Sequence, residues 1–264
     1  MTKLAICGAA GRMGRRMLAL AENDADLEVT GVLEISDHAA LGERASGDVV
    51  FTSDGRAALA DCDVAITFSL PEGTMDHVAL AVELGKPLVI GTTGLTRKQQ
   101  ATISEAAGKV PVVFAPNMSL GVNLLFDLVA KTAKVLGDDY DIEIVEAHHH
   151  LKKDSPSGTA VKLGEIAAEA LDRDYEKDAV HGRIGMVGER TKKEIGMHAV
   201  RGGDVVGEHT VIFAGVGERI ELTHRAHSRD AFASGALTAA KFVHGRDVGL
   251  YDMQHVTGLK SFSE

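Results

Sequence analysis

Up to residue 116 the chain alternates short apolar runs with longer amphipathic stretches. The apolar runs predict strands, and the amphipathic stretches predict helices. The expected strands are residues 3–7, 28–34, 63–69, 87–93 and 111–116, and the expected helices are residues 12–23, 72–85 and 96–108. Strands that alternate with helices favour a parallel sheet covered by helices on both faces. The N-terminal part is therefore predicted to be an α/β domain of the doubly wound class.

The pattern changes after residue 116. Helices are expected at residues 120–136 and 157–171, and strands at residues 140–149, 194–201, 208–214 and 218–226. The last two strands are joined by "GVG", which suits an antiparallel hairpin. These elements predict a mixed α+β domain over residues 117–228. A helix near 230–244 could pack back on the first domain, so residues 1–116 are expected to be completed by residues 229–264.

The charge balance limits the partners of the chain. Its 264 residues include 28 Lys plus Arg and 38 Asp plus Glu, a net charge of −10. This balance discourages binding to nucleic acid or to an anionic membrane, and an anionic substrate would need a local basic cluster. Glycines interrupt the N-terminus before a signal peptide could form, and no run of about 18 apolar residues could span a bilayer. A cytoplasmic location is expected.

A glycine-rich loop follows the first predicted strand, in the stretch "KLAICGAAGRMGRRM". Gly8, Gly11 and Gly14 would let the backbone approach a pyrophosphate at the N-terminus of a helix. Glu34 ends the second predicted strand, where an acid can accept hydrogen bonds from a ribose. NADH or NADPH is the expected cofactor, and the alternative is a tight turn that needs glycine only for packing. Ile35 offers no cation to a 2′-phosphate, although Arg12, Arg15 or Arg16 could reach across to one.

Two more predicted strands end in small and polar residues, "GTTG" (91–94) and "APNMS" (115–119). The carboxyl ends of strands in an open α/β sheet are where ligands bind. These turns could therefore contact the nicotinamide and its ribose, although they would also serve as ordinary turns.

The stretch "EAHHHLKKDSPSGTA" (146–160) is the densest group of chemically active side chains. In a strand, His148 and His150 would share one face while His149 points to the other, which disfavours a metal site. A solvated basic loop is a further alternative. An acid/base centre fits better, because imidazole titrates near neutrality and Lys152 adds a second proton donor. Gly158 and Thr159 then open a helix whose first N–H groups can hold a carboxylate.

Five motifs together resemble the dihydrodipicolinate reductase family. They are "GAAGRMG", "GTTG", "APN", the histidine stretch and "RGGDVVGEHT", and the resemblance covers nearly the whole chain. It implies a Rossmann-like N-terminal domain followed by a domain for substrate and tetramer contacts. The implied activity is NAD(P)H-dependent reduction of a cyclic imine dicarboxylate in the diaminopimelate and lysine pathway.

The resemblance also implies roles for single residues. His148 would be the proton donor or acceptor and Lys152 a further proton donor, and His149, Gly158 and Thr159 would contact the substrate. The residues implied to line the cofactor are Gly8, Ala9, Ala10, Gly11, Arg12, Met13, Glu34, Gly91, Thr92, Thr93, Ala115, Pro116, Asn117 and Met118. Some family members carry Arg directly after the acidic residue, and Ile35 takes that place here. No metal is implied.

Two other functions are compatible with these features. One is a different two-domain NAD(P)H oxidoreductase whose histidine stretch serves another acid. The other is a dinucleotide-sensing regulator, which would need a partner surface or a DNA-reading module. The acidic charge and the lack of an extra basic helix argue against the regulator.

Overall fold

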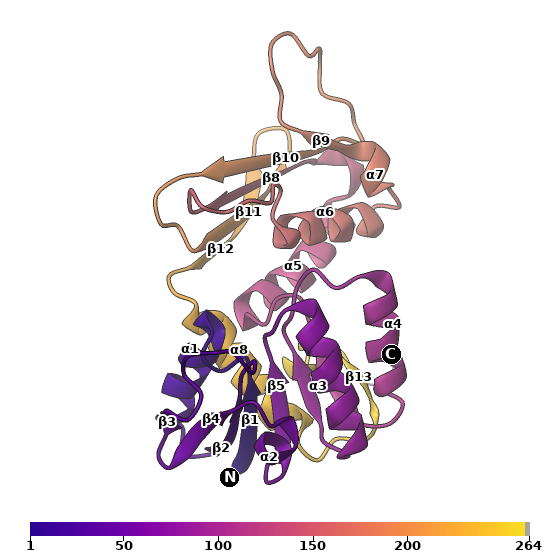
Figure 1. Ribbon diagram of the computed structural model, residues 1–264. Coiled ribbons are helices and arrows are strands. Elements are labelled where there is room, and N and C mark those ends of the chain that lie inside the picture. The colour runs from indigo at the N-terminus through magenta and orange to yellow at the C-terminus, as the bar shows by residue number, and fades with distance from the viewer. Residues whose placement is uncertain (262–264) are drawn as a thin grey trace. The chain divides into compact units, whose positions relative to one another are not determined.

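The computed structural model describes residues 1–261 of the chain. The chain divides into two compact units: the first contains Met1–Leu120 and Arg229–Glu264, and the second contains Gly121–Ser228. Each unit has its own sheet and its own apolar core (Figure 1). No helix in residues 1–261 is long and apolar enough to cross a membrane.

The first unit is built on an eight-stranded sheet with the order β13-β7-β6-β5-β1-β2-β4-β3. The strands are β1 (Thr2–Cys7), β2 (Leu27–Leu33), β3 (Arg44–Ser46), β4 (Val49–Thr52), β5 (Val64–Thr67), β6 (Leu88–Ile90), β7 (Pro111–Phe114) and β13 (Gly249–Tyr251). All neighbouring pairs are parallel except β3 with β4. The chain builds outward from β1 in one direction through β2 and β4, and then returns to the other side of β1 with β5. Ligands of open α/β sheets bind at this change of direction.

Helices cover both faces of the first sheet (Figure 1). They are α1 (Arg12–Ala21), α2 (Gly55–Leu59), α3 (Pro71–Glu83), α4 (Arg97–Ala106), α8 (Asp230–Val243) and α9 (Met253–Val256). One apolar core lies under α1 and α8, and another lies under α2, α3 and α4. Strand β5 is buried at each of its four residues, as expected for a strand packed on both faces. The predicted doubly wound α/β fold is confirmed.

Helix α8 brings the C-terminal segment onto the strands β1, β5, β6 and β7. Its Gly235 lies against the backbone of Met118, where a Cβ atom would stand 1.8 Å from the Met118 carbonyl oxygen. Only glycine permits this approach. The residues just before and just after the second unit are therefore packed together within the first.

The second unit contains a mixed sheet with the order β12-β11-β8-β10-β9. Its strands are β8 (Asp141–His148), β9 (Ala179–His181), β10 (Ile195–Arg201), β11 (Gly207–Ala214) and β12 (Arg219–Ala226), and its helical elements are α5 (Leu120–Leu136), η1 (Gly137–Asp139), α6 (Gly158–Ala170) and α7 (Tyr175–Asp178). Strands β11 and β12 form the predicted antiparallel hairpin. Residues of α5 and α6 share one apolar core with inward-facing residues of β8, β10 and β11. Along β8, buried and half-buried residues alternate, so Glu146 and His148 lie on the core side and Glu143 on the other.

The structure corrects the predicted strand at 140–149. Strand β8 ends at His148, and the chain then turns. The backbone N–H of His150 donates to the Gly203 carbonyl (3.2 Å), while the Gly202 N–H donates to the His148 carbonyl (3.0 Å). Because His149 and His150 lie beyond the strand, the alternation of strand faces does not determine where their side chains point.

Several short elements were not predicted, among them β3, β4, β9, β13, α2, α7 and α9. None of them is longer than five residues. A segment this short shows too few repeats for its hydrophobic period to be recognised.

Candidate functional site

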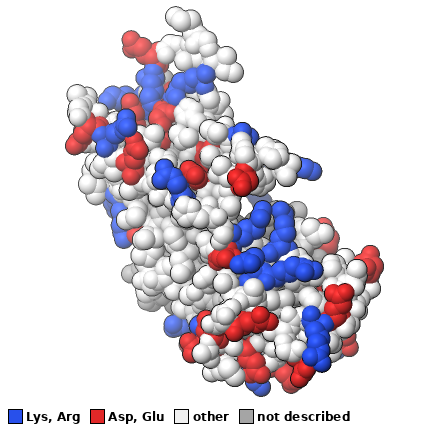
Figure 2. Space-filling view, turned by 90° about the vertical axis from the view of Figure 1, so that its left-hand side faces the viewer, with Lys and Arg blue, Asp and Glu red and all other residues white. Residues whose placement is uncertain are grey.

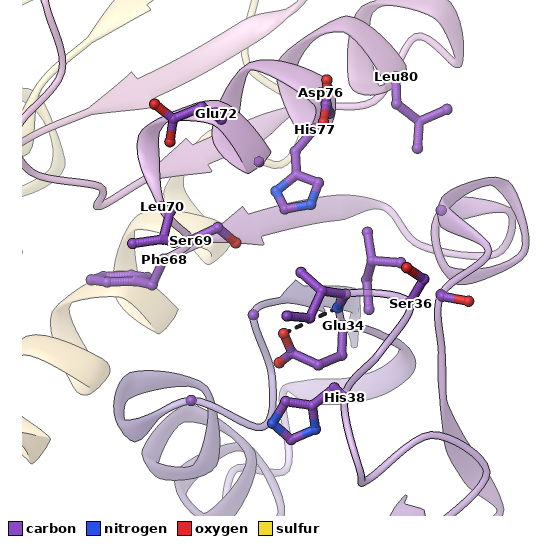
Figure 3. Close-up of a pocket in the computed structure, with 17 residues that line it drawn as sticks. Glu34, Ser36, His38, Phe68, Ser69, Leu70, Glu72, Asp76, His77 and Leu80 are labelled. Atoms are coloured by element: carbon purple, nitrogen blue, oxygen red, sulfur yellow. Dashed lines mark hydrogen bonds between the residues drawn. The ribbon is translucent and has the colours of Figure 1, made fainter.

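A cavity of about 780 Å³ lies in the first unit at the carboxyl ends of its central strands (Figure 3). Gly8 follows β1, Glu34 follows β2, and Phe68 follows β5, and all three line the cavity. The complete lining is Gly8, Gly11, Leu33, Glu34, Ile35, Ser36, His38, Ser53, Gly55, Phe68, Ser69, Leu70, Glu72, Gly73, Asp76, His77 and Leu80. The cavity therefore lies where the strand order changes direction.

The glycine loop forms one edge of this cavity. Gly8 has a φ of +75°, a left-handed conformation that favours glycine. Gly11 is the N-cap of α1 and makes no side-chain cap, which leaves the first N–H groups of the helix without a side-chain acceptor there. A Cβ at Gly14 would stand 2.4 Å from atoms of Ala9 and Gly8, so glycine is needed there for close packing of helix and loop. The loop thus presents backbone to the cavity, as an anion site requires.

Glu34 carries the acidic charge closest to this loop. Its carboxylate accepts hydrogen bonds from the N–H groups of Ala10 (3.0 Å) and Ile35 (3.2 Å). The lining also contains the carboxylates of Glu72 and Asp76, and in the described part of the chain it includes no Lys or Arg. The Ile35 side chain is largely exposed. A neutral, hydroxyl-rich ligand suits this surface better than a further phosphate.

The structure brings Gly8, Gly11 and Glu34 together, and places the other predicted cofactor residues outside the cavity lining. Gly91 lies against the Phe68 ring, where a Cβ would stand 2.2 Å from the ring. Thr92 shares a hydrogen bond of 2.7 Å with Thr74. The remaining predicted positions outside the lining are Ala9, Ala10, Arg12, Met13, Thr93, Ala115, Pro116, Asn117 and Met118.

Part of the lining was not predicted from the sequence. Phe68, Ser69, Asp76 and His77 come from the end of β5 and from α3. Burial lowers the pKa of His77, and its Nδ1 atom lies 2.9 Å from the Thr67 hydroxyl. Phe68 and Ser69 lie at the carboxyl end of the third predicted strand, where ligands of open α/β sheets bind, so the same rule would have predicted them.

In the second unit, a buried carboxylate organises the histidine stretch. Glu146 is 1% exposed, and its Oε2 atom lies 2.5 Å from Nδ1 of His148. Arg201 donates to both carboxylate oxygens at 2.8 Å, and the backbone N–H of Ser157 donates to Oε1 at 3.0 Å. Glu146 therefore connects the end of β8, the end of β10 and the start of α6.

Burial lowers the pKa of His148, and the carboxylate of Glu146 partly offsets this effect. Burial alone would raise the pKa of Glu146, but the hydrogen bonds from Arg201 and His148 lower it below the usual value. His209, on β11, lies edge-on to His148 with 5.2 Å between ring centroids. Burial lowers the pKa of His209 to about 3, so this ring is neutral at pH 7.

The other predicted residues of the stretch surround this cluster. Lys152 donates to Asp154 at 2.9 Å, and its charge contributes to lowering the pKa of His148. Gly158 and Thr159 begin α6, whose N-cap Ser157 accepts from the Ala160 N–H. Space is open around Gly158.

His149 has a buried Nδ1 atom with no hydrogen-bond partner in residues 1–261. The described part of the chain contains no group of three or more His, Cys, Asp or Glu side chains placed to hold a metal ion. Contacts through Glu146, Arg201 and Asp154 link His148, Lys152 and the start of α6.

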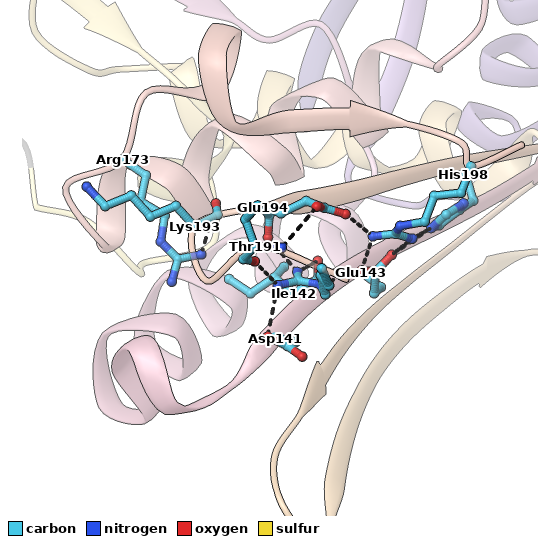
Figure 4. A network of polar contacts seen from close by, with 10 residues as sticks. Asp141, Ile142, Glu143, Arg173, Thr191, Lys193, Glu194 and His198 are labelled. Atoms are coloured by element: carbon cyan, nitrogen blue, oxygen red, sulfur yellow. Dashed lines mark hydrogen bonds and ion pairs between the residues drawn. The ribbon is translucent and has the colours of Figure 1, made fainter. Parts of the chain in front are cut away.

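A second charged cluster, not predicted from the sequence, lies on the other face of β8 (Figure 4). Glu143 accepts from Arg183 (2.7 Å) and Arg190 (2.9 Å), and its Oε2 atom lies 2.6 Å from Nε2 of His198. Burial alone would raise the pKa of Glu143, but Arg183, His198 and Arg190 lower it to about 2. Arg183 also pairs with Glu194. This cluster fastens residues 182–194 to the sheet.

Acidic and basic side chains are interspersed over the face shown in Figure 2, with basic side chains gathered just below the middle of the view and again near its top. A nucleic-acid-binding surface instead gathers many basic side chains to neutralise phosphates. On the face in this view, acidic side chains lie among the basic ones.

Family models and a curated relative identify the same family for this chain. The family models described as "Dihydrodipicolinate reductase, N-terminus" and "Dihydrodipicolinate reductase, C-terminus" match residues 2–118 and 121–257. A 4-hydroxy-tetrahydrodipicolinate reductase of Syntrophotalea carbinolica is 52% identical over 267 residues, covering 98% of this chain and 100% of that protein.

Two solved structures share the fold. A dipicolinate-bound dihydrodipicolinate reductase from a Paenisporosarcina species aligns with a TM-score of 0.76 and 26% identity, covering 96% of this chain and 97% of that one. A myo-inositol dehydrogenase from Corynebacterium glutamicum aligns with a TM-score of 0.59 and 14% identity, covering 94% and 90%. The second likeness is one of fold alone.

Proposed function

The chain belongs to the dihydrodipicolinate reductase family, and from this premise we propose which of its residues carry the reaction. It is an NAD(P)H-dependent oxidoreductase that forms tetrahydrodipicolinate, with loss of water when the substrate ring carries a hydroxyl, in the diaminopimelate and lysine pathway. In this proposal, residues 1–116 together with residues 229–264 bind the cofactor, and residues 117–228 bind the substrate.

His148 and Lys152 are the proton donors in this proposal, and His149, Gly158 and Thr159 hold the dicarboxylate. One observation carries it: Glu146 bonds both to His148 and to the N–H of Ser157, at the start of α6. The imidazole therefore lies beside a helix N-terminus, whose N–H groups favour an anion. The related Paenisporosarcina reductase has a dicarboxylate, dipicolinate, bound to it, which agrees with such a site.

NADH or NADPH supplies the hydride when bound. Negative charge then develops on the ring-nitrogen side of the conjugated imine, and a protonated His148 or Lys152 neutralises it. The backbone at Gly158 and Thr159 keeps one carboxylate in register, so the second unit contributes positioning and electrostatics.

We assign the dinucleotide to the cavity of the first unit. Gly8 and Gly11 would hold the pyrophosphate, and Glu34 would accept from the ribose hydroxyls. Because the lining carries three carboxylates and includes no Lys or Arg, we expect NADH to bind more tightly than NADPH. The family resemblance assigns the remaining contacts to Ala9, Ala10, Arg12, Met13, Gly91, Thr92, Thr93, Ala115, Pro116, Asn117 and Met118.

A homotetramer is proposed from the same resemblance. Helices α5 and α6 pack on one face of the second unit's sheet, while apolar side chains such as Val145, Val200 and Ile212 stay partly exposed on the other. A partly apolar sheet face suits contact with another copy.

The cytoplasmic location stays a prediction.

The test is oxidation of NADH and of NADPH by the purified protein with the freshly prepared condensation product of pyruvate and aspartate semialdehyde. We expect turnover with both and a lower KM for NADH. Folded protein that binds NADH but oxidises neither cofactor would contradict the proposed function and favour a dinucleotide-sensing role. Turnover with other acids only would indicate a different oxidoreductase.

A further inference from the structure

Glu146 has no free hydrogen-bonding capacity. Its Oε2 atom is bonded to Nδ1 of His148 and to Arg201, and its Oε1 atom is bonded to Arg201 and to the N–H of Ser157. These four contacts use the lone-pair positions of a carboxylate, and the side chain is 1% exposed. Glu146 can therefore act on a substrate only through the groups that it holds.

The contact with Glu146 defines the state of the His148 ring. An ionised carboxylate only accepts hydrogen bonds, so Nδ1 must carry the hydrogen, and in the neutral ring Nε2 holds the free electron pair. Nε2 of His148 has no hydrogen-bond partner in residues 1–261 and lies beside Gly207, where a Cβ would stand only 3.1 Å away. The absence of a side chain at Gly207 keeps this edge of the ring clear.

We propose that Glu146 is the positioning residue of the active site: it holds His148 by Nδ1, so that Nε2 is the atom that exchanges the proton, and Arg201 holds the carboxylate in place. This inference rests on the proposed function. It adds to that function a residue, a ring tautomer and the reacting atom.

Arg201 extends the arrangement to the second proton donor. One of its nitrogens, Nη2, donates both to Glu146 (2.8 Å) and to the carbonyl of Asp154 (2.7 Å). Asp154 in turn accepts from Lys152. A single guanidinium thus fixes the carboxylate under His148 and the loop that carries Lys152.

The charges around His148 show what removal of Glu146 would do. The titratable or charged groups that face the ring are Glu146 from β8, Arg201 from β10, His209 from β11 and Lys152 from the following turn. Glu146 is the only anion among them. Because burial, Lys152 and Arg201 all lower the pKa of His148, loss of the carboxylate should lower it further.

The experiment compares Glu146→Gln with Glu143→Gln, a matched control. Glu143 lies on the same strand and also has arginine and histidine partners, but it faces the other side of the sheet. For Glu146→Gln we expect kcat to fall by about 10- to 100-fold while KM for NADH is unchanged. The limb of the pH–rate profile that requires protonated His148 should move to lower pH. Glu143→Gln should leave kcat and the profile unchanged, and Glu146→Asp should recover part of the loss.

A nitrogen-15 NMR titration of the His148 ring needs no turnover, so it separates this inference from the proposed function. Spectra of His148→Gln assign the signals. We expect the Nδ1–H tautomer in the unaltered protein and a lower His148 pKa in Glu146→Gln. An Nε2–H tautomer in the unaltered protein would overturn the inference even if Glu146→Gln did not fold. A normal kcat and pH profile in folded Glu146→Gln would also overturn it.

Discussion

Strand β8 carries two glutamates with similar partners on its opposite faces. Glu146 contacts His148 and Arg201, and Glu143 contacts His198 and two arginines. Glu146 is 1% exposed and contacts the start of a helix, whereas the side chain of Glu143 is 20% exposed and holds a long loop. A glutamate, a histidine and an arginine in contact are therefore not sufficient to identify a catalytic centre.

The difference lies in what each histidine can still do. His148 is bonded through Nδ1, and within residues 1–261 its Nε2 has no hydrogen-bond partner and lies beside a glycine, near the first turn of α6. His198 uses Nε2 for its bond to Glu143, and Arg183 lies 3.4 Å from the same atom. The two rings therefore differ in which nitrogen meets the glutamate: His148 is held by Nδ1 beside the start of α6, and His198 is held by Nε2 in the cluster that contacts the loop.

The largest effect should come from removing the two histidines in turn. His148→Gln should lower kcat/KM by about 10²- to 10⁴-fold, the usual range for loss of a general acid. His198→Gln should leave kcat/KM near the normal value, because that ring only helps to hold the loop. Steady-state kinetics test both variants, and NADH affinity, measured by fluorescence, should be unchanged in each. Equal losses of activity in the two variants would contradict the assignment of a catalytic role to His148 and a structural role to His198.

The arginines should differ in their effect on stability. Arg201→Met leaves the buried carboxylate of Glu146 without its cation and should lower the free energy of unfolding by about 3 kcal/mol. Arg183→Met should lower it by less, about 2 kcal/mol, because Glu143 keeps Arg190 and only Glu194 loses its cation. Urea unfolding measures both.

The control for this prediction is the double variant Arg201→Met with Glu146→Gln. If an unpaired buried charge causes the loss, the second change should recover part of it. A double variant that is less stable than Arg201→Met would contradict that cause.

Acid should remove the stabilisation that the Glu143 cluster provides. The pKa of Glu143 is about 2 in the folded chain, below its unfolded value, because its arginine and histidine partners outweigh the effect of burial. A depressed carboxyl pKa stabilises the fold above the unfolded pKa, near 4.3, and this contribution is lost as the pH falls toward about 2. The difference in unfolding free energy between the unaltered chain and Glu143→Gln should be full at pH 7 and shrink below about pH 5. A difference that grows on acidification would contradict the assignment.

The smallest effect concerns one glycine beside each cluster. Gly207→Ala would bring a Cβ to 3.1 Å from Nε2 of His148, so the ring must move by a few tenths of an ångström, and kcat should fall by less than about tenfold. Gly196→Ala would place a Cβ 1.8 Å from the Glu143 carboxylate, which should reduce stability by about 1 kcal/mol and leave kcat unchanged. Steady-state kinetics and thermal unfolding are measured for both variants. A loss of kcat in Gly196→Ala and none in Gly207→Ala would indicate that the Glu143 cluster, and not the Glu146 cluster, serves the reaction.

The parts of this site that the sequence predicted are close together in the chain. His148, Lys152 and Gly158 lie within one stretch, so the end of a strand and the start of a helix are sufficient to bring them together. Arg201 and His209 lie in the motif "RGGDVVGEHT", but their place beside His148 depends on strand register. That register pairs Arg201 with His148 between β10 and β8, and no local pattern specifies it.

The first unit shows the same limit. Gly8 and Glu34 were predicted because glycine-rich turns and acids at strand ends follow a general rule. Asp76 and His77 reach the cavity from α3, and their positions depend on how that helix packs on the sheet. The turn after His148 was also missed, because backbone hydrogen bonds to Gly202 and Gly203 end the strand there.

The contact of Gly235 with Met118 also has a consequence for the order in which the chain folds during synthesis. Helix α8 covers strands β1, β5, β6 and β7 of the first unit, yet it leaves the ribosome only after the whole second unit has been made. Until then, the apolar residues under α8 are uncovered. The second unit, which is continuous in sequence, can fold first, and the N-terminal sheet is completed last although its first strands are synthesised earliest.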